Sequence, residues 1–326
     1  MNRKSKEKLK DLGIAAGITA TAAATSYLLT NFLVRLAMNR DMQKVAENAG
    51  NIIAGNKIDQ GFFNVLKTKS DELAKKPNEE IKITAHDGIK LVGHYIPSEK
   101  PERVLIAMHG WRSSWHSDFG MVSDAWEKYN CSVLYAEQRG QNNSGGEYMG
   151  FGLTERYDCV SWVNWVIENV GEDIPIYLVG VSMGATTVLL ASELNLPKQV
   201  HGIIADCGFT SPDAIWKHIA RNNLKLLYGL KGIIADDLYE RNTNENSEYS
   251  TENALRNTDI PVLFVHGTDD HFVPVRMTYD NYAACASPKE MLIVPGADHG
   301  MSYYLDQNKY ENMVLRFWNK YDKYER

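Results

Sequence analysis

The sequence has few cysteines, and none of them has the spacing of a metal site or of a redox motif. Its four cysteines are far apart along 326 residues, and no two form a CxxC pair. No HExxH motif and no cluster of histidines and carboxylates is present either. We therefore expect free, buried thiols, with no disulfide framework, no bound metal and no cofactor. The thiols are Cys131, Cys159, Cys207 and Cys285.

An excess of positive charge is also lacking. The formal net charge is −6 at pH 7, whereas a protein that binds a phosphate backbone needs a basic stripe. We therefore do not expect nucleic acid as a partner. There is no internal repeat and no low-complexity tract, and 44% of the residues are hydrophobic. This composition is typical of a globular protein with one large core.

The N-terminal region differs from the rest in having a long run without charge. Leu12–Val34 is about 23 residues long, enough to cross a hydrocarbon layer as a helix, although it is rich in Ala, Gly and Thr. Three interpretations stay open: an uncleaved membrane anchor, a signal peptide cut near Ala22–Ala24, and a surface or core helix. We favour the anchor. The more basic flank precedes the run, so the rest of the chain is expected outside the cytoplasm.

By pattern, the chain divides into three parts. Residues 1–40 are the basic flank and anchor, residues 41–77 have spaced apolar positions typical of a helical connector, and residues 78–326 form the main domain. A chain that begins near Asp41 is therefore expected to be soluble and active.

In the main domain, buried strand patterns alternate with helical patterns. A hairpin around His86-Asp87-Gly88 opens the domain, and apolar runs then alternate with segments of ten or more residues that have helical spacing. This alternation predicts an α/β fold with a mostly parallel sheet of about eight strands covered by helices on both faces. Residues 210–259 interrupt the alternation with apolar positions at helical spacing, which predicts a small helical lid. Trp216 in this insert is a candidate for contact with a substrate.

A serine stands between two glycines where a buried strand meets a helix. The stretch "IYLVGVSMGATTVLL" contains Gly180-Val181-Ser182-Met183-Gly184. Such a nucleophile elbow exposes the serine at the carboxyl edge of the sheet, where open α/β sheets bind their ligands. Ser182 is therefore the predicted nucleophile.

A serine hydroxyl needs a base and an acid that orients the base. His299 is the last histidine and follows the last strand pattern, in "VPGADHGMS", so we predict it as the base. The residues alone leave three candidates for the acid, each at the end of a strand pattern: Asp206, Asp269 and Asp270.

From about residue 79 to the end, the sequence resembles the α/β-hydrolase superfamily, in particular bacterial membrane-associated serine hydrolases of uncertain substrate. The segments that carry the resemblance are "MHGWRSS", "EQRGQNNSGG", "GVSMGA", "HGTDDHFVP" and "GADHGMS". The resemblance implies that Asp270 is the acid and that the backbone N–H groups of Trp111 and Met183 form the oxyanion hole, the Trp111 ring lining the pocket. It also implies that Arg139 is structural, while Gln141 and Asn142 depart from the commoner loop sequence.

These features predict a membrane-anchored serine hydrolase that cleaves carboxylic esters of small to medium acyl or aromatic groups through an acyl-enzyme. A peptidase or an acyltransferase would use the same residues. A non-enzymatic alternative is a membrane-tethered scaffold protein that has the same fold but no catalytic activity.

Overall fold

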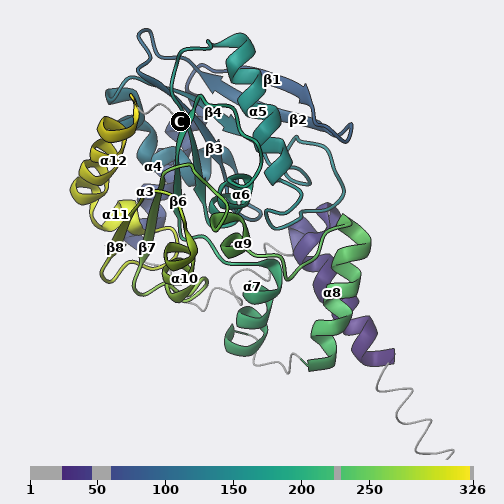
Figure 1. Ribbon diagram of the computed structural model, residues 1–326. Helices are drawn as coiled ribbons and strands as arrows, with labels where there is room; N and C mark the ends of the chain where they lie inside the picture. The colour runs from purple at the N-terminus through teal and green to yellow at the C-terminus, as the bar shows by residue number, and fades with distance from the viewer. Residues whose placement is uncertain (1–23, 46–59, 224–228, 324–326) are drawn as a thin grey trace, which may run out of the picture.

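The computed structural model describes residues 24–45, 60–223 and 229–323, and its centre is one eight-stranded sheet (Figure 1). The strand order is β1-β2-β4-β3-β5-β6-β7-β8. Strands β1 and β2 run antiparallel to their neighbours, and β3 to β8 are parallel to one another. The strands are β1 (Glu79–Thr84), β2 (Lys90–Ile96), β3 (Arg103–Met108), β4 (Cys131–Ala136), β5 (Ile176–Val181), β6 (Val200–Asp206), β7 (Val262–Gly267) and β8 (Lys289–Val294). The predicted α/β fold and its mostly parallel sheet are confirmed.

Helices cover both faces of this sheet, because its central strands are apolar on both sides. One face carries α5 (Arg156–Asn169), α6 (Met183–Ala191), α9 (Thr251–Leu255) and α10 (Arg276–Ala284). The other carries α3 (Gln60–Lys75), α4 (Trp115–Lys128), α11 (Ser302–Leu305) and α12 (Gln307–Tyr321). All four cysteines are buried free thiols.

The insert between β6 and β7 contains α7 (Pro212–His218), a π-helical turn η2 (Ile219–Asn223), α8 (Gly229–Thr243) and α9. Helix α7 begins at Pro212 because the Ser211 side chain caps it by accepting from the Ala214 N–H. Helices α7 and α8 share an apolar cluster with Met183, which follows Ser182, and with the N-terminal segment. Leu224 and Leu227, which belong to the predicted helical pattern, lie outside the described residues.

The N-terminal segment is helical over residues 24–38, and the short 3₁₀ helix η1 (Arg40–Met42) follows. Figure 1 shows it in purple beside α8. Val34 and Met38 are buried in the cluster shared with α8, whereas Leu28 and Phe32 are 68% and 48% exposed. Residues just before position 41, which the sequence patterns place with the anchor, therefore pack into the same apolar cluster as α8.

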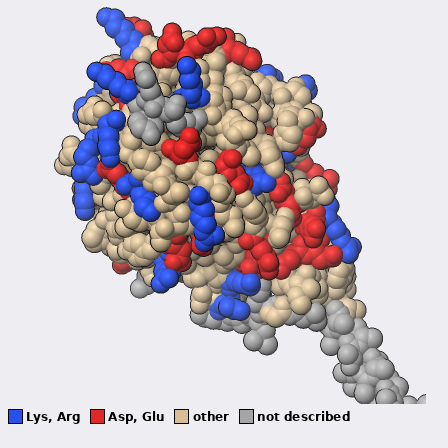
Figure 2. All heavy atoms as spheres, viewed as in Figure 1, with Lys and Arg blue, Asp and Glu red and all other residues tan. Residues whose placement is uncertain are grey.

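No helix within residues 24–45, 60–223 and 229–323 is both long enough and apolar enough to cross a bilayer. The basic flank, residues 12–23 of the predicted anchor and residues 46–59 of the predicted connector lie outside the described residues. On the face seen in Figure 2, basic side chains are interspersed with acidic ones.

Candidate active site

Ser182 lies at the sharp turn from β5 to α6, with φ 55° and ψ −117°. Few residues other than glycine adopt a positive φ, so the turn is strained at the serine. The glycines on either side are required by close packing. A Cβ on Gly180 would lie 2.2 Å from the Gly184 carbonyl oxygen, and one on Gly184 would lie 1.8 Å from the Met108 carbonyl oxygen. This packing presents the Ser182 hydroxyl at the carboxyl edge of the sheet, as the sequence pattern predicts.

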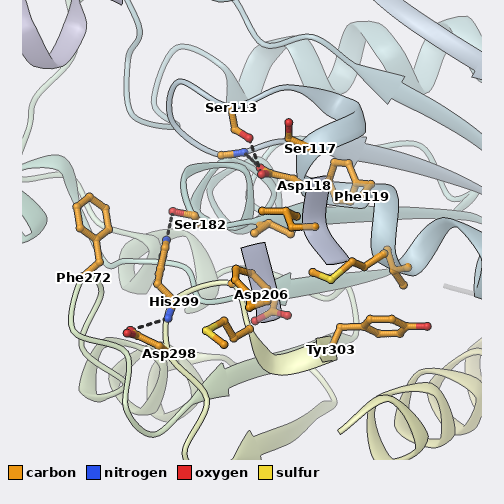
Figure 3. Close-up of a pocket in the computed structure, with 18 of the residues that line it drawn as sticks. Ser113, Ser117, Asp118, Phe119, Ser182, Asp206, Phe272, Asp298, His299 and Tyr303 are labelled. Carbon is orange, nitrogen blue, oxygen red and sulfur yellow. Dashed lines mark hydrogen bonds between the residues drawn. The ribbon is translucent and has the colours of Figure 1, made fainter. Parts of the chain in front are cut away.

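The three predicted side chains form one chain of hydrogen bonds. His299 Nε2 lies 2.9 Å from Ser182 Oγ, and His299 Nδ1 lies 2.7 Å from Asp270 Oδ2. Figure 3 shows His299 pointing at Ser182 from the loop after β8. Since Asp270 accepts at Nδ1, the neutral imidazole carries its proton there and presents Nε2 as a base toward the serine.

Asp270 is held by four contacts. Its Oδ1 accepts from the N–H groups of Phe272 (2.9 Å) and Val273 (2.7 Å), and its Oδ2 lies 3.0 Å from His266 Nε2 as well as near His299. Burial alone would raise the pKa of Asp270, but the charge of His299 and the hydrogen bonds from both histidines hold this pKa well below its usual range. For His299, burial opposes the charged form, but the Asp270 carboxylate outweighs it and raises the pKa of His299 well above its ordinary value.

His266 also contacts Asp270, and the sequence patterns assigned it no role. Its ring is fully buried, and its Nε2 faces both Asp270 Oδ2 and the Val273 carbonyl, 2.9 Å away. Two acceptors at Nε2 require a proton there, so Nδ1 accepts from the Thr278 hydroxyl at 2.6 Å. His266 stands four residues before Asp270 in "HGTDD". This short spacing was the only sequence feature that pointed to a contact between the two side chains.

The other two candidate acids lie elsewhere. Asp269 accepts from the Thr268 hydroxyl and is exposed. Asp206 accepts from the Ser302 hydroxyl at 3.3 Å and faces the pocket, and burial raises its pKa to about 6. Within the described chain neither has a hydrogen bond to His299, so of the three carboxyls the structure brings Asp270 to the histidine.

The two predicted oxyanion donors stand on loops at the ends of β3 and β5. Within the described residues, neither the Trp111 N–H nor the Met183 N–H has a hydrogen-bond acceptor. Met183 begins α6, where the first N–H groups of a helix are free and the helix dipole favours negative charge. Both groups are therefore available to an oxyanion formed at Ser182.

Side chains of two other segments, helix α4 and the loop after β4, fix the loop that carries Trp111. Asp118, from the first turn of α4, accepts from the Gly110 N–H (2.6 Å) and from the Ser113 hydroxyl (2.5 Å). Gln141 Oε1 accepts from the Arg112 N–H at 2.5 Å, and the Asn142 amide donates to the Ser113 carbonyl at 2.9 Å. The two residues that depart from the commoner loop sequence thus position the oxyanion loop, a role that the sequence analysis did not foresee. Arg139 binds Asp158 with two hydrogen bonds in the interior, consistent with its expected structural role.

The N-terminal segment supplies the third support for this loop. The Trp111 indole N–H donates to the Ala37 carbonyl (2.7 Å), and the Arg112 guanidinium donates to the carbonyls of Leu36 (2.9 Å) and Asn39 (2.7 Å). The last carbonyls of a helix have no partner within the helix, so these contacts satisfy the end of helix 24–38. A chain that starts near Asp41 would lack all three acceptors, so this geometry predicts lower activity for such a chain than the sequence patterns suggested.

A cavity of about 500 Å³ opens at Ser182 and His299 and extends between α3, α4 and α11. Trp111 lines it, as predicted. Trp216 does not, and this expectation is corrected: its ring packs against Phe151 and Tyr239, at centroid distances of 5.3 and 5.5 Å, inside the cluster that joins the insert to the domain.

One group of three side chains among the described residues has the geometry of potential metal ligands. The donor atoms of Cys207, Asp270 and His299 all lie within 4.8 Å of one another. Asp270 and His299 already bind each other and, through His299, Ser182, so a metal ion would have to displace these contacts.

A family model described as the prolyl oligopeptidase family matches residues 119–324. The chain belongs to this family. It is accordingly a serine hydrolase with the α/β-hydrolase fold.

The chain is also similar to individual proteins. The chain is 29% identical over 187 residues to the uncharacterized protein YqkD of Bacillus subtilis, a match that covers 57% of this chain and 61% of that protein. It is 28% identical over 236 residues to the uncharacterized protein YfhR of Salmonella typhimurium, covering 68% and 74% of the two chains. The esterase Pf2001 of Pyrococcus furiosus superposes with a TM-score of 0.63 at 22% identity, over 76% of this chain and 92% of that one, which shows the shared fold.

Proposed function

We propose that this hydrolase cleaves carboxylic esters with small to medium acyl or aromatic groups through an acyl-enzyme. The observation that carries the proposal is the hydrogen-bonded chain from Asp270 through His299 to Ser182, which opens into a mostly apolar cavity. A cavity with mostly apolar walls suits the apolar group of an uncharged ester.

Acylation follows from the geometry. Ser182 Oγ attacks the ester carbonyl carbon while its proton passes to His299 Nε2, and the carbonyl oxygen becomes an oxyanion that accepts from the N–H groups of Trp111 and Met183. The tetrahedral intermediate then breaks its bond to the alcohol oxygen, which takes the proton from Nε2 and leaves. Asp270 stabilises the imidazolium that exists between these two transfers.

Deacylation repeats these steps with water. His299 Nε2 accepts a proton from a water molecule as its oxygen attacks the acyl carbon, the same two N–H groups bind the new oxyanion, and the proton returns to Ser182 Oγ as the acid leaves. An alcohol or amine in place of water would give an acyl transfer.

Peptidase activity is the second candidate, and the family placement favours it, since the family is that of prolyl oligopeptidase. The amide differs from the ester in needing its leaving nitrogen protonated, a task that falls to the same His299 Nε2.

Two assays test the proposal together. A fluorophosphonate probe should label the folded wild type and leave Ser182→Ala unlabelled. A panel of p-nitrophenyl esters run beside aminoacyl anilides should show turnover of esters with far slower turnover of anilides. Faster cleavage of anilides would make the chain a peptidase, and failure of the folded protein to react with the probe would favour a non-catalytic scaffold.

We also propose that residues 12–34 attach the enzyme to a membrane, with the hydrolase domain outside the cytoplasm. The uncharged run and the exposed apolar side chains of Tyr27, Leu28, Leu29 and Phe32 support this. The full-length protein should remain in the membrane pellet after a carbonate wash, and protease added from outside should reach the domain. Full-length protein found only in the cytosol would refute the anchor.

A further inference from the structure

Helix α3, which precedes the family match, lines the cavity at Ser182. Phe62 and Leu66 stand one helical turn apart and both line the cavity. Phe63 and Val65, on the same helix, are 47% and 38% exposed. The helix therefore presents one apolar edge to the cavity and another to solvent.

Close packing on α4 fixes this edge in place. A Cβ on Gly120 of α4 would lie 2.7 Å from the Lys69 carbonyl, so the two helix backbones nearly touch there. The Lys69 ammonium binds Asp124 at 2.9 Å, and Ser70 Oγ lies 2.8 Å from His116 Nδ1. The position of α3 relative to Ser182 is thus set by direct contact with the helix that follows the oxyanion loop.

The neighbouring walls of the cavity are apolar as well. Val122 and Trp126 of α4 and Met301 and Tyr303 near α11 line the cavity, and the Phe62 ring packs edge-on against Tyr304 at a centroid distance of 5.2 Å. Helix α3 thus bridges from α4 to α11 and limits the space beyond Ser182.

The charged groups in the cavity are mostly acidic. Asp118, Asp206 and Asp298 line it, and the guanidinium of Arg112, which also lines it, is bound to backbone carbonyls of the N-terminal segment. An anionic group in the substrate would therefore meet repulsion and find no free guanidinium to pair with.

We propose that this cavity holds the apolar group of the ester, on its acyl or its alcohol side, and that Phe62 and Leu66 set the longest group that fits. The substrate class is then uncharged esters with a medium-length alkyl or aryl group and no carboxylate. This inference rests on the proposed ester hydrolysis and assigns substrate selection to a helix outside the matched family region.

The experiment compares two variants of neighbouring residues in the full-length chain. Leu66→Trp fills the cavity, and Val65→Trp places the same side chain on the exposed side. Two substrate series are used: p-nitrophenyl esters with acyl chains from acetate to dodecanoate, and acetates of alcohols of graded length. In the series whose variable group occupies the cavity, we expect Leu66→Trp to lower kcat/KM for the long substrates at least tenfold relative to the shortest substrate. Val65→Trp should keep the wild-type dependence of kcat/KM on chain length.

A third variant guards against misfolding. Leu66→Ala enlarges the cavity and should move the preference toward longer chains, with folding of every variant checked by thermal unfolding. If folded Leu66→Trp showed the wild-type chain-length profile in both series, α3 would not select the substrate. If the tryptophan variant does not fold, the same result with Leu66→Ala would overturn the assignment. In either case, ester hydrolysis by the wild type would stand. Absence of ester turnover in the wild type would instead remove the proposed function.

Discussion

Two of the loops that build the site at the carboxyl edge of the sheet are held in different ways. The turn after β5 that carries Ser182 is fixed by its own glycines, which allow the backbones of β3 and α6 to approach. The loop after β3 that carries Trp111 is fixed by residues outside the loop, most of them distant in sequence. They are Asp118 in the helix that follows, the more distant Gln141 and Asn142, and the carbonyls of Leu36, Ala37 and Asn39.

This difference determines how each loop can be disrupted. The serine turn is a local motif, so changes within it act directly on the nucleophile. The oxyanion loop depends on the rest of the fold, so a change far from Ser182 can move its N–H donor, and displacement of a donor costs catalysis steeply.

Removal of the nucleophile should have the largest effect. Ser182→Ala should lower kcat by about a millionfold, whereas Asp270→Ala should lower it by about ten thousandfold, because the acid acts through His299. Steady-state kinetics with a p-nitrophenyl ester measure both.

Asp269→Ala and Asp206→Ala are the matched controls, since neither carboxyl has a hydrogen bond to His299 within the described chain. Asp269→Ala should be nearly neutral, and Asp206→Ala should retain far more activity than Asp270→Ala. If folded Asp206→Ala lost its activity while Asp270→Ala kept most of its activity, the catalytic acid would be Asp206 at the end of β6.

Removal of the N-terminal segment should have the next largest effect. A chain that starts at residue 41 lacks the acceptors of the Trp111 indole and of the Arg112 guanidinium, so we expect kcat to fall by about a hundredfold, the typical loss for one oxyanion donor. A chain that starts at residue 24 keeps these contacts and serves as the control. Equal kcat values for the two folded chains would show that the segment does not position the loop.

Gln141→Ala should have a smaller effect. It removes the acceptor of the Arg112 N–H and leaves this donor unsatisfied at a cost of about 1–3 kcal/mol, part of which should appear as a roughly tenfold fall in kcat. Asn143→Ala, in the same loop but with an exposed side chain, should retain most activity. If the two variants behaved alike, Gln141 would have no special role in the loop.

The smallest expected effect is a shift in the pH dependence of kcat/KM. His299 acts as a base only when neutral, and its pKa is raised above 6.5, so kcat/KM should fall as pH decreases through this raised value. In Asp270→Asn the carboxylate that raises this pKa is gone while burial still lowers it, so the acidic limb should move to lower pH. A limb that stays in place would mean that another group controls it.

Much of this arrangement could be predicted from local patterns. The alternation of strands and helices, the elbow glycines around Ser182 and the position of His299 after the last strand are short-range features, and each has a local physical reason. The choice of Asp270 needed the family resemblance, because three carboxyls end strand patterns and only distances to His299 separate them. Trp216 was assigned to the substrate because apolar spacing on a helix is the same whether the helix faces a ligand or the core.

The sequence by itself determined the sheet, the nucleophile and the histidine, since periodicity and glycine sterics act over a few residues. Only the tertiary structure decided which carboxyl meets His299, that α3 rather than Trp216 borders the cavity, and that residues 34–40 support the oxyanion loop. These are contacts between segments distant in the chain, and they depend on how whole helices pack, which no local spacing encodes.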